Sequence, residues 1–141
     1  MPKQTPAAVL DLQSPAASLQ TFLEETLSGA PLFIFFVASK EPTTSQPWCP
    51  DVRKAAPIVD KFFDEHEQKL NFLTVEVGLK PEWRAADNVF RTEWGLQAIP
   101  TLAKYYIMDL EGEKIVAIRM LVEAECCEVE KLQGLVEDDP M

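Results

Sequence analysis

The sequence is poor in the residues that build metal and phosphate sites. It contains one histidine, His66, and three cysteines that are not clustered with it, so we expect no zinc or iron site. Its five glycines are scattered and form no glycine-rich phosphate loop. The cysteines lack the spacing of a disulfide framework, which favours a reducing compartment. We therefore expect a cytoplasmic protein that binds no metal or cofactor.

Basic residues and long apolar runs are also scarce. The chain of 141 residues has 13 Lys and Arg against 23 Asp and Glu, and its net charge of −10 at pH 7 repels phosphate backbones and anionic lipids. The longest apolar run, 32–38, is far shorter than the roughly 20 residues needed to cross a bilayer. Only Lys3 is basic near the N-terminus, so no signal peptide is expected. The negative charge therefore argues against nucleic acid and membranes as partners, whereas an acidic surface suits basic partners.

What the sequence does contain is an alternation of strand and helix patterns. A hydrophobic content of 47% is enough for the core of one domain, taken as residues 1–141 with loose ends at 1–7 and 137–141. The order of elements predicts an α/β fold in which a central mixed sheet is flanked by helices on both faces. Residues 79–96 read as irregular or partly helical, and residues 109–113 as a hairpin turn. Strands are predicted at 8–12, 32–38, 71–77, 101–108 and 114–122, and helices at 14–29, 51–66 and 124–136.

The most informative motif is Cys49-Pro50-Asp51-Val52, which follows Trp48 at a junction between strand, loop and helix. It has the form of a thiol redox motif with one thiol missing. In a Cys-x-x-Cys pair the first thiolate attacks a disulfide and the second releases the product. Here Val52 stands in the fourth place, and the helical spacing turns it inward. We expect Cys49 to be the nucleophile and its sulfur to be presented to solvent at the start of the helix.

These residues belong to a wider pattern. The chain resembles the fourteen-kilodalton thioredoxin-related proteins, also called the thioredoxin domain-containing protein 17 family, whose hallmark is Trp-Cys-Pro-Asp-Cys. The resemblance implies a thioredoxin-like fold. The further matching blocks are Ser39-Lys40, Val77-Gly78-Leu79-Lys80-Pro81-Glu82-Trp83, Asn88-Val89-Phe90-Arg91, Ile99-Pro100-Thr101-Leu102 and Leu121-Val122-Glu123-Ala124-Glu125-Cys126.

The resemblance implies a cytosolic disulfide reductase that is recharged by thioredoxin reductase and acts on small disulfides, nitrosothiols or persulfides. It also implies a cis peptide bond before Pro100, which would face the cysteine, while the backbone of Ile99 would pair with a bound peptide. Trp48 beside the thiol would touch the substrate. Because Val52 replaces the resolving cysteine, an external thiol such as glutathione would have to complete the cycle.

Two functions stay open. One is a monothiol oxidoreductase that acts through Cys49 on small disulfides or thiol-modified proteins, with the thioredoxin or glutathione system as partner. The other is a redox-inactive binding or adaptor module that uses the groove by Trp48 and Pro100. Neither remaining cysteine is expected to replace the missing thiol: Cys126 is expected to be structural and Cys127 solvent-exposed. We expect a monomer.

Overall fold

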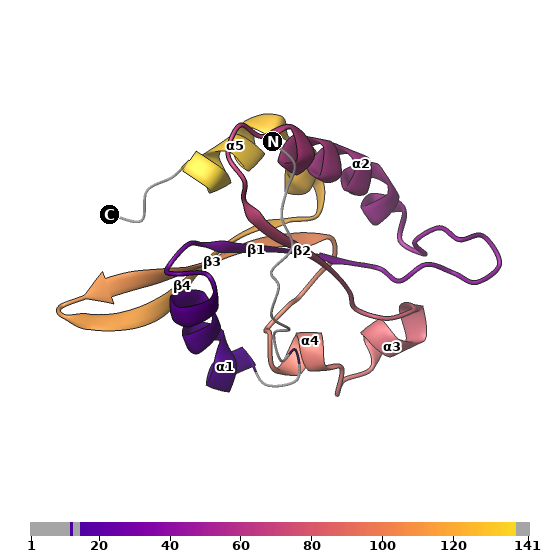
Figure 1. Ribbon diagram of the computed structural model, residues 1–141. Helices are drawn as coiled ribbons and strands as arrows, with labels where there is room; N and C mark the ends of the chain where they lie inside the picture. The colour runs from indigo at the N-terminus through magenta and orange to yellow at the C-terminus, as the bar shows by residue number, and fades with distance from the viewer. Residues whose placement is uncertain (1–11, 13–14, 138–141) are drawn as a thin grey trace.

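The computed structural model describes residue 12 and residues 15–137 (Figure 1). Its strands form one mixed sheet in the order β2-β1-β3-β4, with β1 and β2 parallel and the other neighbours antiparallel. The strand predicted at 8–12 lies outside the described residues except for Leu12. The four strands are β1 (Leu32–Val37), β2 (Asn71–Glu76), β3 (Thr101–Leu110) and β4 (Glu113–Val122).

Helices cover both faces of this sheet (Figure 1). On one face lie α2 (Pro50–Glu65) and α5 (Val129–Glu137). On the other lie α1 (Pro15–Thr21), which a π-helical turn continues over Phe22–Thr26, and the short helices α3 (Lys80–Arg84) and α4 (Val89–Thr92). The predicted α/β class with helices on both faces of a mixed sheet is therefore confirmed. The helices within residues 15–137 are all too short or too polar to cross a bilayer.

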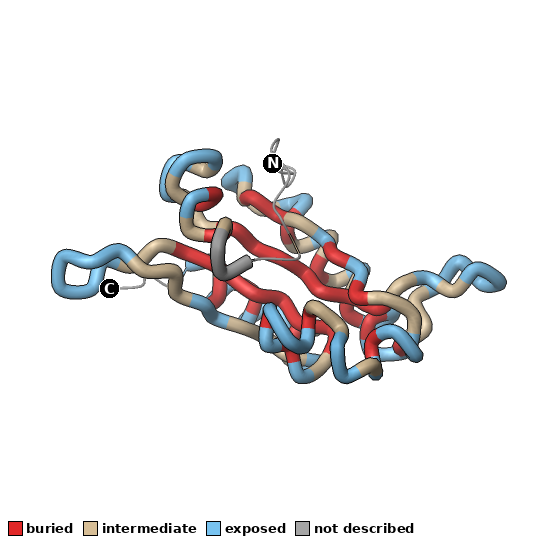
Figure 2. The backbone as a smooth tube through the Cα atoms, turned by 90° about the horizontal axis from the view of Figure 1, so that it is seen from below, coloured by how far each residue is buried: buried red, intermediate tan, exposed pale blue. Residues whose placement is uncertain are grey.

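The central strand β1 explains this layering. All six of its residues are buried, because successive side chains point to opposite faces and both faces are covered. Phe33 meets Phe63 of α2 with ring centroids 5.2 Å apart, whereas Phe36 meets Trp94, on the other face, at 5.5 Å. In Figure 2 the buried strands run through the middle of the molecule, whereas the loops and the tip of the β3–β4 hairpin are exposed.

Three predicted boundaries are wrong. The last helix does not begin at residue 124, because Glu123–Cys127 forms a 3-10 turn in which the Glu125 carboxylate accepts a hydrogen bond from the Val122 N–H at 2.9 Å. Glu137 is still helical, so the loose end predicted from that residue starts too early. The hairpin turn contains only Glu111 and Gly112, whose positive φ values of 54° and 86° suit a two-residue turn.

The packing of α2 on the sheet generates a stability prediction. Phe63→Ala should lower the free energy of unfolding by about 3–5 kcal/mol, because the fully buried ring would leave a cavity between α2 and the sheet. The neighbouring Phe62 is only partly buried, so Phe62→Ala is a matched control and should lose less than half as much. Urea unfolding measures both variants. Equal losses would contradict the assignment of this stability to burial under α2.

Candidate thiol site

Cys49 is placed by the start of α2. It is the N-cap residue, with extended backbone angles (φ −92°, ψ 120°), and its carbonyl accepts hydrogen bonds from the N–H groups of Val52 and Arg53 at 3.1 and 3.2 Å. Pro50 is the first helical residue, a position that suits proline because the N–H there has no partner within the helix. The sequence therefore ends its polar loop and starts the helix directly at the thiol.

The exposure of this thiol is smaller than expected. Cys49 is 9% exposed, whereas Pro50 and Asp51 are exposed. The expectation of a sulfur presented openly to solvent is therefore wrong. The physical reason is that Cys49 belongs to the hydrophobic core cluster, against which the partly buried Trp48 packs. Val52 is fully buried, as its inward helical position predicts. A disulfide that Cys49 attacks would have to reach its sulfur through the small part of the residue's surface that remains exposed.

A hydrogen-bonded brace holds the loop before Cys49 against the end of β2. The carbonyl of Gly78 accepts bonds from the Ser39 N–H at 3.1 Å and from the indole N–H of Trp48 at 2.9 Å. The Gly78 N–H donates to the Ser39 hydroxyl at 3.0 Å, and the Trp48 N–H donates to the Ser39 carbonyl at 3.3 Å. Trp48 therefore has its indole N–H engaged by the protein. Sequence reasoning did not assign this role to Ser39 and Gly78, although both lie in blocks that carry the family resemblance.

Pro100 stands at the same end of the sheet as this loop. The Ile99–Pro100 peptide bond is cis, and the next residue, Thr101, pairs with Phe36 near the carboxyl end of β1. Both Ile99 and Pro100 are buried. Within the described residues the backbone N–H and C=O of Ile99 have no hydrogen-bond partner. The strand order thus places the Ile99–Pro100 segment and the loop that leads to Cys49 at the same end of the sheet.

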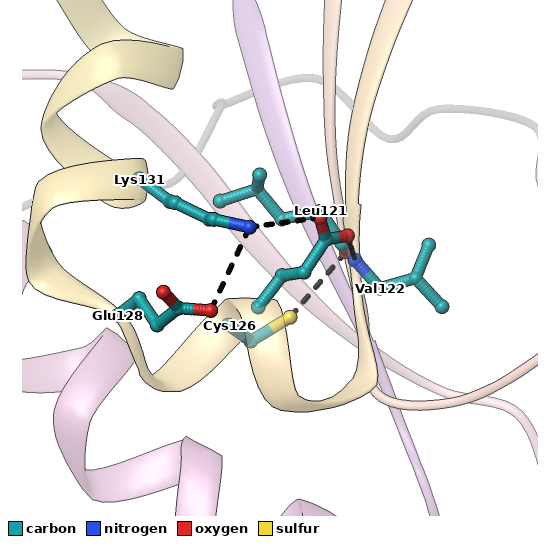
Figure 3. Close-up of polar contacts among 6 residues, drawn as sticks. Leu121, Val122, Cys126, Glu128 and Lys131 are labelled. Carbon is teal, nitrogen blue, oxygen red and sulfur yellow. Dashed lines mark hydrogen bonds and ion pairs between the residues drawn. The ribbon is translucent and has the colours of Figure 1, made fainter.

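The second cysteine, Cys126, lies against the backbone carbonyls of Pro100 and Leu121. Its sulfur is 3.4 Å from the Leu121 carbonyl oxygen and 3.8 Å from that of Pro100, and the residue is completely buried. Figure 3 shows the contact between Cys126, in the 3-10 turn, and Leu121 near the end of β4. Burial raises the pKa of the Cys126 thiol to about 12, so it stays protonated at neutral pH. Cys126 is therefore structural.

The third cysteine differs from its prediction. Cys127 is partly buried and packs against the core cluster, so the expectation of a solvent-exposed side chain is wrong. The reason is the 3-10 turn, which orients residues 123–127 differently from the regular helix that was expected. All three cysteines are free thiols. Within the described residues no three His, Cys, Asp or Glu side chains gather in a way that could hold a metal ion.

A mixed sheet with helices on both faces, a cysteine at the N-cap of α2 and a cis-proline before β3 define a protein of the thioredoxin-like class. Residues 14–132 match the model of the thioredoxin domain of thioredoxin domain-containing protein 17-like proteins. The chain belongs to that family.

Three relatives illustrate the similarity. Thioredoxin domain-containing protein C21C3.12c of Schizosaccharomyces pombe is 36% identical over 120 residues, which cover 85% of this chain and 94% of the relative. Thioredoxin domain-containing protein 17 of Mus musculus is 31% identical over 111 residues, covering 79% and 81%. The Homo sapiens protein of the same name is 30% identical over 115 residues, covering 82% and 85%.

The position of Gly78 in this hydrogen-bonded brace predicts that its substitution by alanine strongly destabilises the protein. Gly78 has φ +116°, and a Cβ there would lie 2.8 Å from the Cβ of Glu82, so Gly78→Ala should lower the free energy of unfolding by about 1–3 kcal/mol or more. Gly95 is the matched control. It also has a positive φ, +69°, but no atom within 4 Å of an added Cβ, so Gly95→Ala should lose only about 1 kcal/mol. Urea unfolding of both variants decides, and a loss at Gly95 that equals the loss at Gly78 would contradict the steric argument.

The buried thiol of Cys126 predicts a loss of stability in alkali. Its pKa is about 12 in the folded protein against an ordinary value of 9.0, so unfolding releases a proton between these pH values. The stability that the protonated thiol contributes is complete below the lower value and is lost as the pH rises to the higher one. Wild type should therefore lose stability more steeply than Cys126→Ala in this window, by up to about 1.4 kcal/mol per pH unit.

Urea unfolding across this pH window measures the difference between wild type and Cys126→Ala. Cys127→Ala is the control and should keep the steep slope of wild type. Parallel curves for wild type and Cys126→Ala would contradict the prediction. Iodoacetamide followed by mass spectrometry gives a second readout, because the native protein should protect Cys126 and the urea-unfolded chain should not.

Proposed function

We propose that this protein is a monothiol oxidoreductase in which Cys49 attacks a disulfide and a separate thiol completes the cycle. The observation that carries the proposal is the pairing of Cys49 at the N-cap of α2 with a fully buried Val52 in the place of a second thiol. This placement puts the cysteine at the start of a helix, next to the exposed Pro50 and Asp51. Cys126 offers no substitute, because it is buried and stays protonated.

The reaction would run in three exchanges. The Cys49 thiolate attacks one sulfur of a disulfide R–S–S–R′, a Cys49–S–S–R bond forms, and R′–S⁻ leaves and takes a proton from water. A glutathione thiolate then attacks the Cys49 sulfur and releases R–S⁻, and a second glutathione attacks the sulfur of the first. The products are two reduced thiols, glutathione disulfide and free Cys49. No tethered thiol speeds release, so the advantage of an effective molarity of ~10⁵ M or more is lost.

The surroundings suit an extended peptide that carries a disulfide. The free backbone groups of Ile99 can pair with a peptide at the end of the sheet, with Trp48 and Pro100 beside it. A net charge of −10 favours basic partners. We propose small disulfides or thiol-modified proteins as substrates, the glutathione or thioredoxin system as the source of electrons, and action as a monomer in the cytoplasm.

One observation favours a second function. Cys49 is only 9% exposed, which restricts access to its sulfur. A redox-inactive module that binds peptides along Ile99 and Pro100 would need no such access. In that case Cys49 acts as a small core residue rather than as a nucleophile.

Cystine reduction by wild type, Cys49→Ser and Val52→Cys separates these functions. With glutathione and glutathione reductase present, wild type should turn over, and Cys49→Ser should lose the activity because no sulfur remains to form the mixed disulfide. Val52→Cys should release the bound half of the substrate faster, because its second thiol attacks the mixed disulfide intramolecularly, and glutathione then reduces the internal disulfide that results. NADPH oxidation followed by absorbance gives the rates.

Cys127→Ser is the matched control and should keep wild-type activity. Turnover that survives in Cys49→Ser would rule out the monothiol mechanism. If Val52→Cys is active and wild type is not, the natural protein is a binding module. Mass spectrometry should find the trapped mixed disulfide at Cys49 when wild type is mixed with cystine alone.

A further inference from the structure

The β4 strand has a side that no described strand covers. In the order β2-β1-β3-β4 it is the last strand, and its hairpin with β3 extends beyond the helices (Figure 1). The pair Leu110 and Glu113 closes the two-residue turn and is a hydrogen-bonded pair, so hydrogen-bonded pairs recur at every second residue from there. The backbone N–H and C=O groups of the even-numbered residues of β4 therefore point away from β3.

The two ends of this free edge are covered by side chains. Near the turn, the amide of Gln20 from α1 donates to the Lys114 carbonyl at 3.1 Å. At the other end, the Glu125 carboxylate accepts from the Val122 N–H at 2.9 Å. Both contacts satisfy groups that would otherwise pair with another strand. Such protection is a common way to keep a sheet edge from pairing with other chains.

Between these covered ends lies an open stretch. Within the described residues, the outward backbone groups of Val116, Ile118 and Met120 have no partner. Ile118 is 50% exposed. We call residues 116–120 the open edge. Its length suits a short extended peptide, which would add to the sheet as a further strand.

A pocket of about 440 Å³ adjoins the open edge on the α1 side of the sheet. Tyr105 forms part of its wall, pairs with Ile118 in the sheet and meets Trp94 edge to face with ring centroids 5.5 Å apart. The Tyr105 hydroxyl is buried and has no hydrogen-bond partner, although such a group loses free energy when it is left unpaired. The residues that line the pocket are Leu19, Gln20, Glu93, Trp94, Tyr105, Glu113, Lys114, Ile115, Val116 and Ile118.

The charges decide which kind of partner fits. Glu93 and Glu113 line the pocket against the single basic residue Lys114. The whole chain carries −10, so a second copy would bring the same charge to the edge. Repulsion between like charges disfavours that pairing, whereas a basic segment is attracted. The only charged residue of the open edge itself is Arg119, but the pocket and the net charge of the chain favour a basic peptide over self-association.

We propose that the open edge and the Tyr105 pocket form a peptide-binding site, distinct from the Cys49 site, for an extended basic segment with a tyrosine anchor. The backbone of the segment pairs with Val116, Ile118 and Met120. Its alternate side chains face the α1 side of the sheet, and the tyrosine among them enters the pocket and hydrogen-bonds the Tyr105 hydroxyl. Main-chain pairing supplies affinity and the pocket supplies selectivity.

The probe for the test is the peptide acetyl-Lys-Val-Lys-Tyr-Lys-Val-Lys-amide, titrated into the full chain labelled with ¹⁵N. The amide signals of Val116, Ile118 and Met120 should shift most. The same peptide with Glu in place of every Lys should have an affinity at least about tenfold lower. Phe for Tyr should also weaken binding to wild type but not to Tyr105→Phe. Shifts centred on Cys49 and Trp48 instead would overturn the proposal.

Backbone pairing is tested with a matched pair of variants. Ile118→Pro removes the outward N–H while the ladder to β3 remains, and Ile118→Thr keeps the N–H but also loses the isoleucine. The proline variant should bind about tenfold more weakly than the threonine variant. Equal affinities would overturn the proposal. If wild type forms a concentration-dependent dimer and Ile118→Pro does not, the proposal would also be overturned, because a second copy of the chain would then occupy the open edge.

Two further measurements keep the test independent of these variants and of the redox proposal. Two peptides, one N-methylated at the odd-numbered residues and the other at the even-numbered residues, should behave differently. One should lose binding and the other should keep it, because only one set of N–H groups faces β4. Equal effects of the two methylation patterns would count against strand pairing. Cys49→Ser should bind the peptide like wild type, and a loss of binding there would place the peptide at the thiol site instead.

Discussion

The burial of β1 on both faces is the constraint on which the rest of the structure depends. Its six apolar residues require a cover on each side of the sheet, and α2 supplies one through Phe63 while Trp94 lies on the other. The loop that follows β1 must leave from the carboxyl end of this buried strand. Because α2 runs back over the face that Phe63 covers, its first turn starts at that end of the sheet. Cys49, the N-cap residue of α2, therefore lies there too.

The two ends of the sheet carry two different chemistries. At the end where β1 finishes, Cys49 lies at the border of the core, while Cys126 supports the Pro100 carbonyl from inside it. Burial separates these thiols, since only one retains any exposed surface. Toward the hairpin, the Tyr105 hydroxyl and the open edge of β4 leave polar groups without partners in the described residues. The proposed nucleophile and the proposed peptide-binding edge therefore share no residues.

Local patterns predicted much of the fold. The apolar run at 32–38, the helical spacing after Pro50 and the paired strands near the C-terminus all correspond to elements of the structure, because periodicity is a local property of the chain. The start of the last helix was missed, because the Glu125 carboxylate bonds the Val122 N–H and holds a 3-10 turn there. That hydrogen bond selects a 3-10 turn over a regular α-helix, and hydrophobic spacing does not distinguish these two conformations.

The sequence by itself determined the chemical content of the thiol site: one cysteine before a helix-starting proline, with an apolar Val52 turned inward. Only the tertiary structure decided that Cys49 is nearly buried, that the Trp48 indole bonds the Gly78 carbonyl, and that Cys126 lies against the Pro100 carbonyl. Exposure and hydrogen bonding depend on which distant segments meet. Those meetings follow from how the sheet and helices pack around β1, and no local stretch of residues contains that information.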